Sequence, residues 1–131
     1  MKHAPIGLYL HVPFCRSKCP YCDFCSFPHP REDTVEAYVD QLIRRMEAWG
    51  ERCTHRTVDT VYLGGGTPTL LHEAQAERLM EGVYRCFAVE ADAEVTVECN
   101  PVAAPQTALA AWKRLGVNRL SMGAQSAQRE E

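Results

Sequence analysis

One stretch of this sequence decides the fold: Val58-Asp59-Thr60-Val61-Tyr62-Leu63-Gly64-Gly65-Gly66-Thr67-Pro68-Thr69. Its first half is rich in β-branched and aliphatic residues and predicts a buried strand over residues 58–63. Its second half predicts a glycine-rich loop. Apolar residues at helical spacing follow, namely Ala76, Leu79, Met80, Val83, Tyr84 and Phe87. The stretch therefore predicts a strand, a loop and a helix in succession.

The same alternation extends towards both ends of the chain. Before this unit, a strand is predicted over residues 6–12. A helix follows it. Asp33, with Glu36 three residues later, is predicted to cap this helix, which ends before Gly50. After it, the pattern predicts strands over residues 93–98 and 118–122. The helix between these two strands carries Leu109, Trp112 and Leu115 and stops at Gly116.

Strands that alternate with helices predict parallel pairing with right-handed crossovers, in an open doubly wound sheet or in a barrel. Both architectures bind ligands at the carboxyl ends of their strands. At roughly 30 residues per unit, the chain holds only about four βα units. We therefore predict an α/β fold, a partial (β/α) TIM-type barrel that is incomplete at its C-terminal side, with residues 1–131 forming the N-terminal part of one core domain.

The composition narrows the class of protein. A chain of 131 residues that is 46% hydrophobic is long and apolar enough for one packed domain. A net charge of -3, with scattered Lys and Arg residues, offers no basic surface for nucleic acid. No apolar run is long enough to span a bilayer, and no signal-peptide core is present. We therefore expect a cytoplasmic protein that has neither a nucleic-acid partner nor a membrane span.

The cysteines point to a metal. There are seven, an odd number, and four of them lie within residues 15–25. Clustered thiols without an export signal favour metal binding over disulfides. The remaining Cys53, Cys86 and Cys99 are interpreted as small buried hydrophobic residues.

Cys15, Cys19 and Cys22 are spaced to wrap an iron–sulfur cluster. Three thiolates on a 4Fe-4S cluster leave one iron free for a small molecule, whereas an electron carrier normally uses four. A structural zinc site made with Cys25 as the fourth ligand is the alternative from the cysteines alone. The glycine run, taken by itself, is more typical of a tight turn between strand and helix than of a ligand site.

The cysteine spacing resembles that of the radical S-adenosylmethionine (SAM) superfamily, with Tyr21 at the family's usual aromatic position. Within it, several segments resemble the oxygen-independent coproporphyrinogen III oxidases and their heme-chaperone relatives, HemN and HemW. These segments are Leu8-Tyr9-Leu10-His11-Val12-Pro13-Phe14-Cys15, Leu63-Gly64-Gly65-Gly66-Thr67-Pro68-Thr69, Glu98-Cys99-Asn100-Pro101 and Arg119-Leu120-Ser121-Met122-Gly123-Ala124-Gln125-Ser126. The resemblance covers most of the chain.

The resemblance implies two cofactors, a 4Fe-4S cluster on Cys15, Cys19 and Cys22, and SAM. Cleavage of SAM by the reduced cluster would give a 5'-deoxyadenosyl radical. The positions implied to bind the cluster-bound SAM are Tyr9, Gly65 and Glu98. The positions implied to contact a second SAM in the oxidase are Tyr21, Gly66, Thr67 and Gln125. His11 is interpreted as an ordinary strand residue, outside catalysis.

Two departures from the oxidase favour the heme-chaperone branch. The cysteine after the third ligand, Cys25, lies one residue further along than in the oxidase. Only fourteen residues precede Cys15, whereas the oxidase carries a long N-terminal extension. The expected ligands and partners are SAM, porphyrin or heme, a heme-acceptor protein and an electron donor. The oxidase activity, a zinc-binding module and a truncated chain without function are the alternatives, so the resemblance leaves open whether this chain is itself an enzyme.

Overall fold

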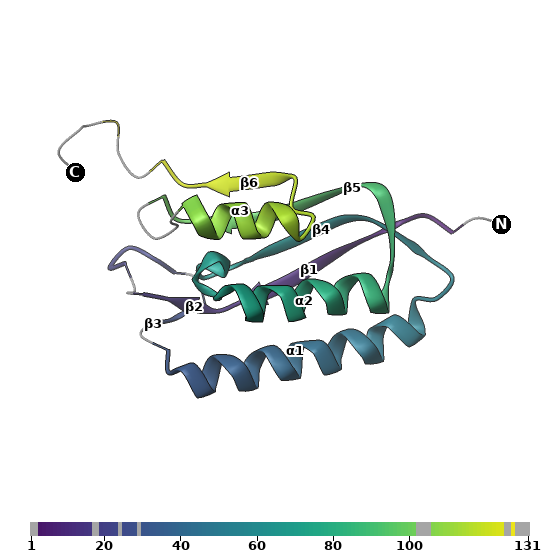
Figure 1. Ribbon diagram of the computed structural model, residues 1–131, viewed down its shortest axis with the longest axis horizontal. Helices are drawn as coiled ribbons and strands as arrows, with labels where there is room; N and C mark the ends of the chain where they lie inside the picture. The colour runs from purple at the N-terminus through teal and green to yellow at the C-terminus, as the bar shows by residue number, and fades with distance from the viewer. Residues whose placement is uncertain are drawn as a thin grey trace.

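The computed structural model describes residues 3–16, 19–23, 25–28, 30–101, 106–124 and 127. The chain alternates strands and helices, with two short strands and one 3-10 turn inserted at its loops (Figure 1). In chain order the elements are β1 (Ile6–Val12), β2 (Phe14–Cys15), β3 (Phe27–Pro28), α1 (Glu32–Arg52), β4 (Thr57–Gly65), η1 (Pro68–Leu70), α2 (Glu73–Cys86), β5 (Ala88–Cys99), α3 (Gln106–Arg114) and β6 (Arg119–Met122).

The main sheet has four parallel strands in the order β1-β4-β5-β6. Because the order in space follows the order along the chain, every crossover moves in the same direction across the sheet. Right-handed crossovers then place all the helices on one face. A doubly wound sheet reverses its strand order and has helices on both faces. The partial barrel is therefore confirmed, and the doubly wound alternative is wrong.

The packing of the side chains confirms this arrangement. A single apolar core joins all three helices to one face of the sheet. Its most buried members are Val12, Val39, Val58, Val61, Leu63, Leu79, Met80, Val83, Val97 and Trp112. Burying a side chain of this size stabilises the fold by about 1.5–3 kcal/mol. The opposite face, which corresponds to the interior of a barrel, carries polar and aromatic side chains, and Tyr9, Tyr62, Thr96 and Arg119 form one row across it.

Two predicted features of α1 are wrong. The helix begins at Glu32 after Arg31, which makes no side-chain cap, and Asp33 instead pairs with the Arg31 guanidinium at 2.6 Å. The helix also continues through Gly50 to Arg52. A Cβ on Gly50 would lie 2.5 Å from the carbonyl oxygen of Cys86, so this glycine permits close packing against α2 and does not end the helix.

Strand lengths also differ from the prediction. β4 runs two residues beyond Leu63, and β5 begins at Ala88 where the prediction began at residue 93. Charged residues such as Glu90 and Asp92 interrupt the apolar alternation at the start of β5, so the sequence pattern does not reveal this part of the strand. The ends of α3 and β6 agree with the prediction to within two residues, and Gly116 after α3 has a φ of 101°.

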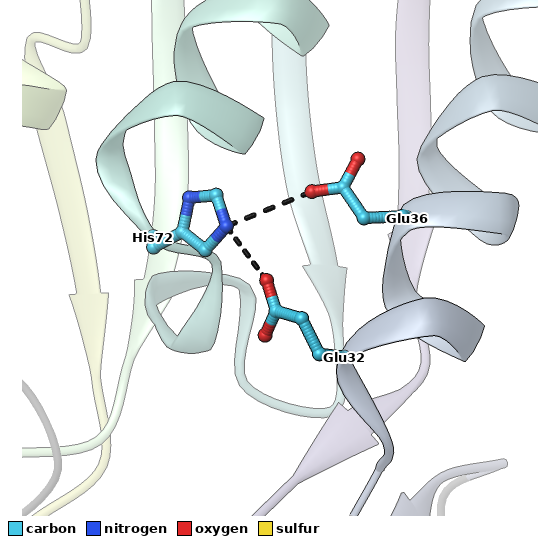
Figure 2. A group of neighbouring side chains, drawn as sticks. All are labelled: Glu32, Glu36 and His72. Atoms are coloured by element: carbon cyan, nitrogen blue, oxygen red, sulfur yellow. Dashed lines mark hydrogen bonds and ion pairs between the residues drawn. The ribbon is translucent and has the colours of Figure 1, made fainter.

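A histidine caps the start of α2 and reaches across to α1 (Figure 2). The Nδ1 atom of His72 accepts a hydrogen bond from the backbone N–H of Gln75 at 3.4 Å, and the Gln75 Oε1 atom accepts the backbone N–H of His72 at 3.2 Å. The proton on the ring is therefore on Nε2, which donates to the Glu32 carboxylate at 2.8 Å.

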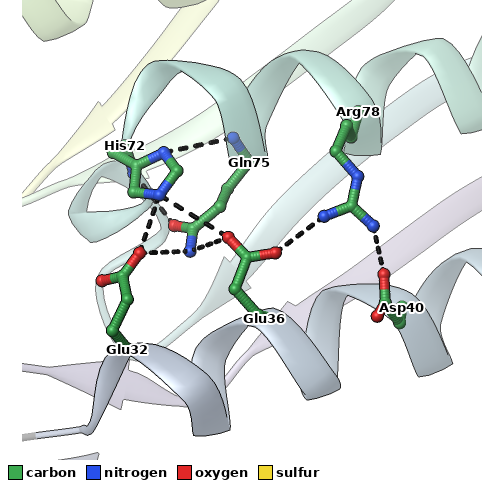
Figure 3. A network of polar contacts seen from close by, with 6 residues as sticks. All are labelled: Glu32, Glu36, Asp40, His72, Gln75 and Arg78. Atoms are coloured by element: carbon green, nitrogen blue, oxygen red, sulfur yellow. Dashed lines mark hydrogen bonds and ion pairs between the residues drawn. The ribbon is translucent and has the colours of Figure 1, made fainter.

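The capping residues belong to a polar network between α1 and α2 (Figure 3). Gln75 is only 2% exposed, and its amide donates to Glu36 at 2.8 Å and to Glu32 at 3.3 Å. Arg78 pairs with Glu36 at 2.7 Å and with Asp40 on the next turn of α1. Exposed ion pairs contribute little individually, so the buried and fully bonded Gln75 amide is the part that fixes the register of the two helices.

We predict that His72→Ala lowers the free energy of unfolding by about 1 kcal/mol, because the cap of α2 is lost. His72→Asn keeps an acceptor at the N-cap but cannot reach Glu32, so it should recover most of that loss. Urea denaturation followed by circular dichroism measures both values. Equal losses in the two variants would show that the link to Glu32, and not the cap, stabilises this end of α2.

Candidate metal centre

The predicted site residues gather at one edge of the sheet. The cysteine loop follows β1, the glycine loop follows β4, and Glu98 is the second-last residue of β5. Because the strands are parallel, these three segments meet at the carboxyl edge, as the sequence predicted.

Short strands clamp the cysteine loop at its base. Phe14 in β2 pairs with Phe27 in β3, and the Phe27 N–H donates to the Pro13 carbonyl at 2.6 Å. Within the loop, the Cys22 N–H donates to the Cys19 carbonyl at 3.0 Å, which forms a turn between these two residues. All the cysteines of the loop are free thiols with partial or full exposure, so they are available as ligands.

The spacing of the thiols bears on the choice between zinc and an iron–sulfur cluster. Tetrahedral zinc, with Zn–S bonds of about 2.3 Å, brings its sulfur ligands to about 3.8 Å from one another. In the described part of the chain, one group of three His, Cys, Asp or Glu residues has all its ligand atoms within 4.8 Å of one another, and it consists of Glu32, Glu36 and His72. The described loop cysteines Cys15, Cys19, Cys22 and Cys25 form no such group. A cubane places each thiolate on a different iron and needs wider spacing.

The glycine loop approaches the cysteine loop through its backbone. The Gly66 N–H donates to the Val12 carbonyl at 2.8 Å, and the Thr67 N–H donates to the Phe14 carbonyl at 2.7 Å. A Cβ on Gly66 would lie 2.5 Å from the Phe14 carbonyl oxygen. Gly65 has a φ of 116°, and a Cβ there would meet the His11 ring at 2.7 Å. These glycines do more than form a turn, because a side chain would separate the two loops.

The Glu98 carboxylate is bound to this loop. It accepts the Gly65 N–H at 3.0 Å and the Tyr62 hydroxyl at 2.7 Å. The hydrogen bond to Glu98 and then burial raise the pKa of Tyr62 above its ordinary value. Burial and the charge of Glu98 likewise raise the pKa of Tyr9, whose ring centroid lies 6.1 Å from that of Tyr62. The structure therefore brings Tyr9, Gly65 and Glu98 to one side of the sheet edge.

The residues expected to contact a second SAM are less closely grouped. Tyr21 is 77% exposed, and a hydrogen bond to Cys19 together with the charge of that thiol raises its pKa. Thr67, in contrast, is buried. Gln125 lies outside the described residues. All the predicted contacts with SAM, by either set of residues, stay predictions.

His11, interpreted from the sequence as an ordinary strand residue outside catalysis, forms hydrogen bonds at the site. Its Nε2–H donates to the Cys25 carbonyl at 3.1 Å, so its Nδ1 atom is the acceptor for the Tyr9 hydroxyl at 2.8 Å. The Tyr38 hydroxyl on α1 donates to the His11 carbonyl. His11 therefore ties β1 to the far end of the cysteine loop. Its position two residues after Tyr9, on the same face of a strand, was the signal that could have found it.

The group of Glu32, Glu36 and His72 resembles a metal site in composition but differs from one in chemistry (Figure 2). A metal would need the lone pair on the His72 Nε2 atom, which carries the ring proton. Moving the proton to Nδ1 would break the cap of α2. The same carboxylates already accept hydrogen bonds from Gln75 and Arg78. This group is a structural link between helices.

The fold is a parallel α/β partial barrel, and at its strand ends three free thiols in one loop lie beside the glycine loop and a carboxylate. This combination defines a class of protein that binds a cluster and a small ligand at its strand ends. The family model described as the radical SAM superfamily matches residues 9–130. This chain belongs to the radical SAM superfamily. Membership implies SAM and a 4Fe-4S cluster as its cofactors.

Similar proteins fall into two groups. The chain is 38% identical over 131 residues to the heme chaperone HemW of Escherichia coli, with 100% of the chain and 35% of that relative covered. It is 37% identical over 128 residues to the heme chaperone HemW of Mycobacterium tuberculosis strain H37Rv, with 96% of the chain and 33% of the relative covered. The solved structure of coproporphyrinogen III oxidase (HemN) from Escherichia coli superposes with a TM-score of 0.90 at 34% identity, covering 96% of this chain and 29% of that one. The chain spans about a third of the length of these relatives.

The residues present fit a 4Fe-4S cluster. The donor set consists of three soft thiolates in one loop, and the glycines let the backbone that enters this loop lie directly against the end of β4. None of the helices in the described ranges is long and apolar enough to cross a bilayer.

We predict that Gly66→Ala destabilises the protein by about 1–3 kcal/mol and prevents ordered packing of the cysteine loop, since its Cβ would meet backbone atoms of Phe14. Gly82→Ala in α2 is the matched control. Its Cβ would crowd only the flexible end of Met46, with Ile43 at ordinary contact distance, and alanine favours a helix. Thermal unfolding and hydrogen exchange of residues 19–28 measure the effect. Equal tolerance of both variants would contradict a steric role for Gly66.

Proposed function

We propose that Cys15, Cys19 and Cys22 ligate a 4Fe-4S cluster whose fourth iron is left for SAM. The observation that carries this proposal is the set of hydrogen bonds that joins the cysteine loop, the glycine loop and Glu98. The glycine loop donates backbone hydrogen bonds to the carbonyls of Val12 and Phe14, which precede Cys15. The N–H of Gly65 donates to the Glu98 carboxylate. When bound, the cluster supplies the electron that cleaves the sulfonium of SAM.

The chain's own residues would bind and orient SAM. The Glu98 carboxylate has lone pairs beyond those used by Tyr62 and Gly65, so it is able to accept further hydrogen bonds from ammonium or ribose hydroxyl groups. Tyr9 donates to His11, which leaves a lone pair on the Tyr9 oxygen as an acceptor. The glycine backbone allows the methionine part of SAM to approach closely. His11 holds the cysteine loop against the strand that carries Tyr9.

For the whole protein we propose heme binding and delivery to an acceptor protein, in the cytoplasm. Two findings support this: the curated relatives named as heme chaperones are up to 38% identical to the chain, and Cys25 lies one residue away from the oxidase's C-x-C position. Oxidative decarboxylation of a porphyrinogen is the second candidate, supported by the TM-score of 0.90 to the oxidase. For either function we propose SAM and a tetrapyrrole as ligands and an electron donor as a partner.

Anaerobic reconstitution of the full chain with iron and sulfide tests the cluster. We expect about four irons per chain and a brown colour that bleaches with dithionite. Cys22→Ala should lose most of the iron, because one of three ligands is removed. Cys25→Ala should retain it, and Cys53→Ala controls for the loss of any thiol. A colourless protein that holds zinc, with Cys25 required, would contradict the proposal.

Heme titration of the reconstituted protein separates the two candidate functions. A chaperone should bind heme with a saturable change in its visible spectrum and pass it to an apo-acceptor. An oxidase should instead convert coproporphyrinogen III in the presence of SAM and reductant. Porphyrinogen turnover without heme binding would replace the first candidate by the second.

A further inference from the structure

A buried threonine hydroxyl lies against the first cysteine of the loop. The Oγ1 atom of Thr67 is 3.6 Å from the Sγ atom of Cys15, within range of a hydrogen bond to sulfur. Thr67 is 8% exposed, so water competes little for this contact. No other hydrogen bond of this hydroxyl is found among the described residues.

The backbone holds Thr67 in this position at both ends. Its N–H donates to the carbonyl of Phe14, the residue before Cys15, at 2.7 Å, and its carbonyl accepts the Leu70 N–H at 2.9 Å. Pro68 follows it and disfavours helical backbone at Thr67, whose φ is -132° and ψ is 88°. Thr67 and Cys15 are therefore joined by a backbone bond and a side-chain bond that reinforce each other.

The direction of the side-chain bond follows from the chemistry of a ligating cysteine. A thiolate bound to iron has no proton, so the Thr67 hydroxyl must be the donor. A hydrogen bond to a ligand sulfur withdraws electron density from the cluster. The reduced cluster carries one more negative charge than the oxidised cluster, so the bond stabilises the reduced state more and raises the reduction potential.

We propose that Thr67 is a positioning residue that acts through Cys15 to make the cluster easier to reduce. This inference rests on the proposed function, because it requires the cluster at Cys15, Cys19 and Cys22. It assigns the Thr67 hydroxyl to the cluster, and it differs from the second-SAM contact that the resemblance implies for this residue.

The test is the midpoint potential of the reconstituted cluster, followed by electron paramagnetic resonance during an anaerobic redox titration without SAM. Thr67→Val removes the hydroxyl and keeps the shape of the side chain, so its midpoint should be more negative than that of the unmodified protein. Thr67→Ser keeps the hydroxyl and should restore the potential. Thr67→Ala serves in place of valine if that variant does not load with iron.

Thr69 provides the matched control. It lies two residues further along and is 4% exposed, and its hydroxyl faces the thiol of Cys99, which is outside the cysteine loop. Thr69→Val makes the same chemical change away from the cluster, so its potential should equal that of the unmodified protein.

The outcomes separate the two proposals. If the unmodified chain binds no iron, the proposed function fails and this inference fails with it. If all variants load a cluster and titrate at one potential, the inference fails while the proposed function stands. A midpoint that shifts equally in Thr67→Val and Thr69→Val would show a general packing effect and would also overturn the inference.

Discussion

The structure depends on the close approach between the glycine loop and the chain that enters the cysteine loop. Two backbone hydrogen bonds, from Gly66 to Val12 and from Thr67 to Phe14, make this contact, and a side chain on Gly66 would separate the partners. Val12 and Phe14, whose carbonyls accept these bonds, have side chains in the apolar core, whereas Gly66 and Thr67 lie outside it. The loop that carries the ligands is therefore attached to the rigid end of the sheet, while its thiols remain exposed enough to bind a cofactor.

A series of hydrogen bonds connects this contact to the rest of the site. Gly65 presents its N–H to Glu98, Glu98 accepts from Tyr62, and the row that contains Tyr62 also contains Tyr9. Tyr9 bonds His11, and His11 bonds the carbonyl of Cys25 at the end of the cysteine loop. The chain of contacts thus starts and ends at the cysteine loop. A change at any link is expected to affect the orientation of the thiols, even where no link touches a cofactor.

Much of this arrangement could be predicted from the sequence because it depends on local patterns. Residues 6–12 alternate in a way that only a half-buried strand explains, and the first strand agrees in both bounds. The glycine run and the cysteine spacing were equally visible. The sequence could not show that Gly50 packs against Cys86, that His72 caps α2, or that His11 reaches Cys25, because each depends on a partner more than ten residues away or on an unusual capping residue. Asp33 was a reasonable cap by residue type, but Arg31 takes that position.

The central claim is that one iron of the cluster has no protein ligand and binds SAM. The most direct measurement is electron nuclear double resonance on the reduced, reconstituted chain with SAM labelled with nitrogen-15 at its amino group and oxygen-17 at its carboxylate. The account predicts that both labels couple to the cluster spin, because the resemblance to radical SAM proteins implies that both groups would bind the free iron. A fully loaded cluster whose spin couples to neither label, with SAM present in excess, would contradict it.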